Sequence, residues 1–180
     1  MKYVLNRLKR NKTIHLIALI VLIILIFNLK SILIYITGSP TPIAVVNGKS
    51  MFPTLREGDI VFVYKPKPQD IRVNDIVVYR KTDGIYVIHR VIEVIEIKTP
   101  YGVNYYYVTK GDNNPVRDPG RISYDELSGV VFKINGMIFK IPYLGYISIW
   151  FNEIRKSLSY SFTQTIFISY SVYYMLYNID

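Results

Sequence analysis

The sequence contains no cysteine and only two histidines, and both shortages limit the chemistry available to it. Without cysteine the chain forms no disulfide bonds and offers no thiolate to a zinc ion or an iron–sulfur cluster. Two histidines are too few for an all-histidine zinc site, which uses three. Any catalysis therefore has to come from other combinations of side chains.

Acidic residues are also scarce, with 13 against 22 basic residues and a net charge of +9. Such an excess can indicate nucleic-acid binding. Much of it, however, lies in an N-terminal cluster beside a long apolar run, and the other basic residues are scattered along the chain. The cluster comprises Lys2, Arg7, Lys9, Arg10 and Lys12. We therefore expect no nucleic-acid partner.

Residues 14–36 form an apolar segment interrupted by Asn28 and Lys30. About 20 residues of helix, rising 1.5 Å each, cross the roughly 30 Å of bilayer hydrocarbon, and Lys30 can extend its ammonium group to the headgroups. A cleaved signal peptide is the rival interpretation. Because Ser39-Pro40-Thr41-Pro42 is a poor cleavage site and a stiff spacer, a retained anchor is favoured. The positive-inside rule then places residues 1–13 in the cytoplasm and Ser50 outside.

Residues 37–151 are expected to form an extracytoplasmic, mainly β domain. Segments rich in β-branched and aromatic residues alternate with Gly/Pro turns, and no convincing helix separates them. The expected strands are 59–64, 75–80, 85–97, 103–109 and 129–134. This pattern predicts an antiparallel, partly closed β-barrel or folded sheet.

Residues 152–180 allow two interpretations. From Leu158 to Ile179 the chain has no charge and is rich in Tyr, Ser and Ile, so it is long enough for a second membrane crossing. Arg155 and Lys156 would then lie on the non-cytoplasmic side, and an aromatic-rich amphipathic helix at the interface fits equally well. The sequence predicts a helical, membrane-associated segment and leaves the number of crossings open.

The catalytic candidates are Ser50, His89, Asp112 and Asp118. Each alone has an ordinary structural explanation, because serines cap turns, histidines occur in strands and aspartates make Asx turns. His89, the only histidine after the anchor, lies in an expected strand, while the serine and both aspartates lie in turns that a sheet can gather at one rim. A serine needs a neighbouring base, and a carboxylate can orient that base. Together the four residues indicate acyl transfer, although neither GxSxG nor Gly-Asp-Ser-Gly is present.

Several blocks of sequence occur in a characteristic order. They are Ser50-Met51-Phe52-Pro53-Thr54-Leu55, Ile88-His89-Arg90-Val91, Lys110-Gly111-Asp112-Asn113-Asn114 with Asp118, and Ile141-Pro142-Tyr143-Leu144-Gly145-Tyr146. Over residues 1–150 this order resembles signal peptidase I of the archaeal and endoplasmic-reticulum type, in which histidine replaces the lysine base of bacterial members.

The resemblance implies a membrane-anchored serine endopeptidase that removes signal peptides from secretory pre-proteins at the outer membrane face. Ser50 would attack the scissile carbonyl and His89 would act as general base. Asp118 matches the residue that orients the histidine and Asp112 a second acid needed for activity, and the sequence does not separate their roles. No cofactor is implied. The partners implied are pre-proteins and the lipid bilayer, with contact to the translocation machinery left open.

The chain departs from the family at Gly48, where members often carry a serine that helps to bind the oxyanion. The backbone N–H of Ser50 would then act with a second donor from Asn47 or Lys49. An extended peptide is expected to add as a strand beside residues 43–46 and 85–97.

The sequence is less consistent with two other functions. A self-cleaving repressor or assembly protease on a similar fold would use a lysine base and a DNA-binding or partner domain, which the sequence lacks. A non-catalytic membrane-anchored β module of a secretion complex would leave the serine, histidine and aspartates without a role.

Overall fold

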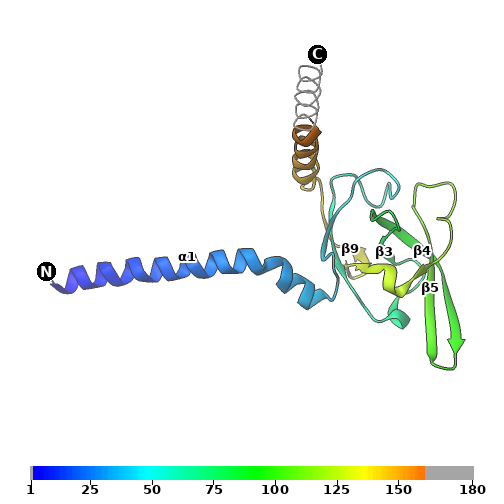
Figure 1. Cartoon of the computed structure of the whole chain (residues 1–180), viewed down its shortest axis with the longest axis horizontal. Coiled ribbons are helices and arrows are strands. Elements are labelled where there is room, and N and C mark those ends of the chain that lie inside the picture. The colour runs from blue at the N-terminus through cyan, green and yellow to red at the C-terminus, as the bar shows by residue number, and fades with distance from the viewer. Residues whose placement is uncertain (1, 161–180) are drawn as a thin grey trace, which may run out of the picture.

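A computed structural model describes residues 2–160 of the chain (Figure 1). A long N-terminal helix, α1 (Lys2–Thr37), projects from a β-rich domain, and a second helix over residues 146–160 leaves the domain in another direction. Most of the expected C-terminal membrane segment, residues 161–180, lies outside the described residues. In the described part, the helix that precedes it begins at residue 146.

The apolar part of α1 is largely uncovered by the other described residues. Among the described residues, Lys12–Thr37 is the one helical stretch long and apolar enough to cross a membrane, and its most apolar window has no buried residue. The helix ends at Gly38, whose φ of +65° is the left-handed conformation typical of a helix C-terminus. The Lys65 N–H donates to the Thr37 carbonyl at 2.8 Å, so the end of α1 is attached to the domain.

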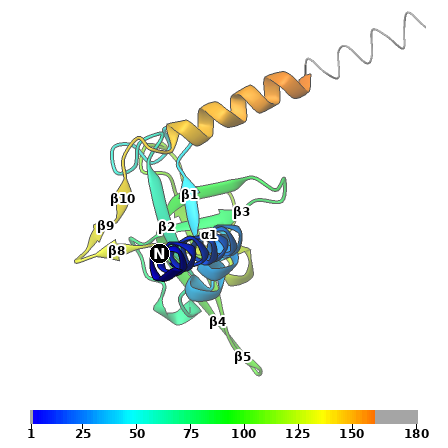
Figure 2. The same ribbon diagram turned by 90° about the vertical axis from the view of Figure 1, so that its left-hand side faces the viewer.

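The domain is a mainly antiparallel sheet with the strand order β1-β2-β7-β3-β4-β5-β6, and β10 also pairs with β2. Figure 2 views the same sheet along α1, with the β8–β9 hairpin at one side. The strands are β1 (Ile43–Val45), β2 (Ile60–Tyr64), β3 (Ile76–Arg80), β4 (Tyr86–Thr99), β5 (Gly102–Lys110), β6 (Ile122–Ser123), β7 (Leu127–Val131), β8 (Lys133–Ile134), β9 (Met137–Ile138) and β10 (Lys140–Ile141). Short 3₁₀ turns span Pro68–Asp70 and Tyr124–Glu126.

The predicted β architecture is confirmed, with the sheet open rather than closed into a barrel. Each expected strand is present within a few residues of its predicted bounds, and the last one is divided at Phe132 into β7 and β8. Among the described strands, β1 and β6 stand at the two ends of the strand order and do not pair with each other.

Two apolar clusters cover the two faces of the sheet. On β3, Ile76 and Val78 enter one cluster while Val77 and Tyr79 enter the other, as the alternation of side chains along a strand requires. The first cluster also contains Met51 and Leu55, which are almost completely buried. Burial of such a side chain contributes about 1.5–3 kcal/mol. The loop that carries Ser50 is therefore rooted in the core.

A buried ion pair fixes the far end of the same loop. Asp59, at the start of β2, is fully buried, and its Oδ2 accepts hydrogen bonds from Lys140 Nζ at 2.6 Å and from the Arg56 N–H at 2.9 Å. Lys140 Nζ also donates to the Thr54 carbonyl at 3.1 Å. One lysine on β10 thus links the loop to the sheet.

Replacing this lysine should destabilise the domain. Lys140→Met leaves the Asp59 carboxylate buried without a cation, and we expect a cost of about 2–3 kcal/mol, or a loss of roughly 5–10 °C in Tm. Thermal unfolding of the full chain in detergent measures this. The double variant Asp59→Asn/Lys140→Met should recover part of the loss, and a single variant with unchanged Tm would contradict the account.

Candidate active site

His89 and Asp118 form a close, buried pair. His89 lies in β4 opposite Val77 of β3, and only 6% of its surface is exposed. Its Nδ1 is 2.5 Å from Asp118 Oδ2. A carboxylate at Nδ1 holds the proton on that nitrogen, so the other ring nitrogen, Nε2, is left as an acceptor. The pair is therefore arranged for His89 to work as a base.

Two further side chains hold the Asp118 carboxylate in place. Its Oδ2 also accepts hydrogen bonds from Thr109 Oγ1 at 2.6 Å and from the Tyr79 hydroxyl at 3.2 Å. Burial raises the pKa of Tyr79 to about 12, so the phenol keeps its proton and remains a donor. The Asp118 N–H in turn donates to the Thr109 carbonyl at 2.8 Å. These bonds converge on the same oxygen that contacts His89 Nδ1, and they hold the carboxylate in place.

Asp112 has different partners. Arg90 binds it through two nitrogens, with Nε 2.8 Å from Oδ1 and Nη2 2.7 Å from Oδ2, and Thr54 Oγ1 donates to Oδ2 at 2.5 Å. Burial alone would raise the pKa of Asp112, but the bonds from Arg90 and Thr54 outweigh it and hold this pKa below its usual value. Asp112 is thus a charged link between β4 and the loop of Ser50.

Ser50 lies in the loop between β1 and β2, held against the segment that follows β5. Its carbonyl oxygen accepts a hydrogen bond from the Asn113 N–H at 2.7 Å, and Asn113 Nδ2 donates to the Lys49 carbonyl at 3.2 Å. Met51, the next residue, is anchored in the core. These contacts hold the Ser50 backbone beside the 111–114 turn.

Gly111 joins this turn to the histidine. It follows Lys110, which pairs with Arg90, so it continues toward the position beside His89. A Cβ on Gly111 would lie 2.8 Å from the Ser50 carbonyl oxygen, too close for an ordinary contact. Only glycine lets the serine backbone approach the end of β5 beside the imidazole.

The structure pairs His89 with Asp118 and Arg90 with Asp112, and it joins the Ser50 backbone to the turn after β5. Among the described residues, no hydrogen bond links the Ser50 hydroxyl with His89. The sequence prediction missed four residues that hold the two aspartates: Tyr79, Thr109, Arg90 and Thr54. Tyr79 could have been found only from the strand register, because it lies two residues beyond Val77, the partner of His89. Among the described residues, no group of three or more His, Cys, Asp or Glu side chains could hold a metal ion.

Comparison with known proteins places the chain in a family. Residues 26–99 match the model of the Peptidase S24-like domain. The chain is 35% identical over 135 residues to the signal peptidase complex catalytic subunit SEC11 of Schizophyllum commune, an alignment that covers 66% of this chain and 68% of that protein.

Relatives in other organisms show the same similarity. The signal peptidase complex catalytic subunit SEC11C of Homo sapiens is 37% identical over 130 residues, covering 69% of this chain and 64%, or slightly less than two thirds, of the human protein. The uncharacterized protein MJ0260 of Methanocaldococcus jannaschii is 28% identical over 172 residues. In agreement with the order of its sequence motifs, the chain belongs to the signal peptidase I family of serine peptidases, in the branch that contains the SEC11 catalytic subunits.

Proposed function

We propose that this protein is a membrane-anchored endopeptidase that cleaves N-terminal signal peptides from secretory precursors, with Ser50 as nucleophile, His89 as general base and Asp118 as the residue that orients the base. The observation that carries the proposal is the buried His89–Asp118 pair, which lies beside the turn that holds the Ser50 loop. The names of the SEC11 relatives, catalytic subunits of the signal peptidase complex, support the choice of substrate.

The reaction proceeds through an acyl-enzyme. The Ser50 hydroxyl oxygen attacks the scissile carbonyl while His89 Nε2 takes its proton. The imidazolium then gives this proton to the leaving nitrogen, the C–N bond breaks, and the signal peptide stays attached to Ser50 as an ester. Water, deprotonated by His89, hydrolyses the ester and regenerates the serine. Asp118 remains ionised and stabilises the transient positive charge on His89.

The oxyanion of each tetrahedral intermediate needs hydrogen-bond donors. Because Gly48 has no hydroxyl group, we assign this role to the backbone N–H of Ser50 together with a donor from Asn47 or Lys49. Asp112 acts as a positioning residue in this scheme, because it connects Arg90 on β4 with Thr54 in the nucleophile loop.

The substrate is expected to bind as an added strand. Among the described strands, β1 stands at the end of the sheet order, so one of its edges has no strand partner, and β1 leads directly to the loop of Ser50. The partly buried Ala44 and Ile88 pack against the first core cluster and offer a shallow apolar surface for small side chains before the cleaved bond. The apolar α1 would hold the domain at the outer membrane face, where enzyme and precursor share one surface.

Removal of the nucleophile or the base should abolish cleavage. Ser50→Ala and His89→Ala are each expected to lower turnover of a secretory precursor by about 10⁴-fold or more, because each removes a group that transfers the proton or forms the ester. The full chain in detergent is incubated with the precursor, and the N-terminus of the product is sequenced. The double variant should be no worse than either single one. A folded Ser50→Ala protein that still cleaves at wild-type rate would refute the assignment of Ser50 as nucleophile, whereas a folded wild type that cleaves no precursor would favour a non-catalytic module.

Asp118 and its hydrogen-bond donor Tyr79 should respond differently to substitution. Asp118→Asn is expected to lower kcat by about 10³- to 10⁴-fold, because an amide can stabilise the wrong tautomer of His89. Tyr79→Phe removes one hydrogen bond to the same carboxylate and should cost only about 3- to 10-fold. Single-turnover rates with the same precursor separate these effects from product release. Equal losses for both variants would show that Asp118 does not orient the base.

Gly111→Ala tests the placement of Ser50. The added methyl group would press on the Ser50 carbonyl, and a displacement of the nucleophile by a fraction of an ångström should lower kcat by roughly 10- to 100-fold. Gly136→Ala, in the β8–β9 turn, is the control: its φ of +80° makes alanine costly in stability, but its Cβ meets no neighbour, so the folded protein should keep wild-type activity. Wild-type kcat for Gly111→Ala would show that the close approach is unimportant for catalysis.

A further inference from the structure

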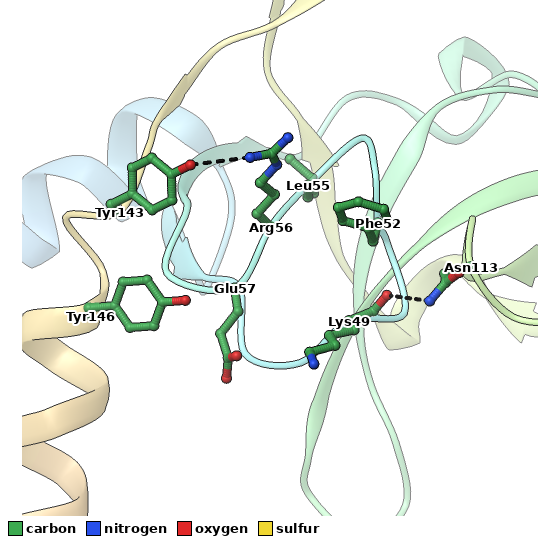
Figure 3. Close-up of a pocket in the computed structure, with 8 residues that line it drawn as sticks. All are labelled: Lys49, Phe52, Leu55, Arg56, Glu57, Asn113, Tyr143 and Tyr146. Atoms are coloured by element: carbon green, nitrogen blue, oxygen red, sulfur yellow. Dashed lines mark hydrogen bonds between the residues drawn. The ribbon is translucent and has the colours of Figure 1, made fainter.

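A pocket of about 400 Å³ lies on the outer side of the nucleophile loop (Figure 3). Its lining comes from this loop, from the turn after β5 and from the segment that begins the 146–160 helix. The residues are Lys49, Phe52, Leu55, Arg56, Glu57, Asn113, Tyr143 and Tyr146. The proposed function assigns no role to this pocket.

The pocket borders the nucleophile directly. Lys49 and Phe52 line it and lie on either side of Ser50 and Met51 in the chain. Met51 is buried in the first apolar cluster, whereas Phe52 is 47% exposed. The pocket is lined both by exposed side chains of the loop and by Leu55, which belongs to that cluster. Asn113, whose side chain donates to the Lys49 carbonyl, borders the pocket (Figure 3). Its N–H also donates to the Ser50 carbonyl.

The C-terminal segment supplies the opposite wall. Gly145 donates its N–H to the Gly58 carbonyl at 2.8 Å, and a Cβ on Gly58 would overlap the ring of Tyr146, so the segment packs tightly on the end of the loop. Tyr143 accepts a hydrogen bond from Arg56 Nη1 at 3.2 Å across the pocket. The pocket is therefore a built feature with two defined sides.

Its charge is positive. Lys49 and Arg56 both line it and neither has a carboxylate partner within residues 12–160, where the ion pairs involve other residues. Arg56 lies 5.8 Å from the centre of the Phe52 ring and so stays beside the nucleophile loop. Glu57 is the single acidic residue in the lining. Two cations against one anion favour an acidic ligand.

We propose that this pocket binds the first residues of the mature chain, those that follow the cleaved bond, and prefers acidic side chains among them. The inference rests on the proposed function. The signal-peptide half of the substrate lies along β1, so the leaving half departs from Ser50 in the other direction. Arg56 lies six positions after Ser50 in the same loop, and an extended chain advances about 3.3 Å per residue, so we expect the first few mature residues to reach it.

A competition between two matched precursors tests the preference. They share one signal half and carry either acidic or lysine residues at the second to fourth positions after the cleaved bond. For the full chain in neutral detergent, kcat/KM should be about 3- to 10-fold higher for the acidic precursor, because each exposed charge pair contributes a small factor. Arg56→Glu should bring this ratio to one or below. Lys98→Glu, at the far end of the β4–β5 hairpin, is the control and should leave the ratio unchanged.

The possible outcomes separate the two proposals. A wild-type ratio near one, or a ratio that Arg56→Glu does not change while cleavage continues, overturns the pocket assignment and leaves the proposed function intact. Absence of cleavage of either precursor by the wild type overturns both. If Arg56→Glu lowers cleavage of both precursors equally, and does so only in vesicles containing anionic lipid, the pocket binds lipid headgroups and the assignment is wrong.

Discussion

The hydrogen bond between His89 and Asp118 is the interaction on which the proposed chemistry of this molecule depends. An imidazole buried in a sheet can serve as a base only if its two nitrogens are distinguished, and the carboxylate does this by holding the proton on Nδ1. The rest of the site maintains that bond. Thr109 and Tyr79 fix the carboxylate through hydrogen bonds that their hydroxyl groups donate.

A second set of contacts, none of which involves the His89 imidazole, holds the loop that carries Ser50. Ser50 stands in a loop that could sample many conformations, but the loop is held at several points. Met51 and Leu55 are buried, Asp112 with Arg90 holds Thr54 from one side, and Lys140 with Asp59 holds it from the other. Each cation here balances a largely buried carboxylate that would be costly to leave unpaired. These ion pairs thus help to order the loop, and Asp118 takes no part in them.

The sequence was sufficient to predict the parts that depend on local pattern. Runs of β-branched residues between Gly/Pro turns located the strands, and the long apolar segment located α1. The order of the motifs predicted the family correctly. The contacts of the two aspartates could not be predicted, because Asp112 and Asp118 both lie in turn sequences and only the fold decides which one meets the histidine.

The site residues that the sequence did not reveal were missed for one physical reason. Tyr79 and Arg90 reach the site through strand register and through a long side chain, and neither can be inferred from spacing along the chain. Gly111 illustrates the same limit. A Cβ at this position would come too close to the Ser50 carbonyl, which is 61 positions away in the sequence. The open edge of the sheet likewise follows from the pairing of all strands together, and the strand pattern alone is compatible with a closed barrel.

The attachment of α1 limits how the catalytic domain can move relative to a membrane. Ser39 is completely buried, and the Lys65 N–H binds the last residue of the helix, so no loose linker separates α1 from β1. If α1 spans the bilayer, the position of the domain above the lipid is set by the helix end. Ser50 follows β1 closely in the chain, so a precursor whose own apolar segment lies in the same bilayer would present its cleavage region at a similar height. A short and rigid connection is therefore sufficient to favour substrates that are themselves inserted in the membrane, because the enzyme and the scissile bond are confined to the same thin layer.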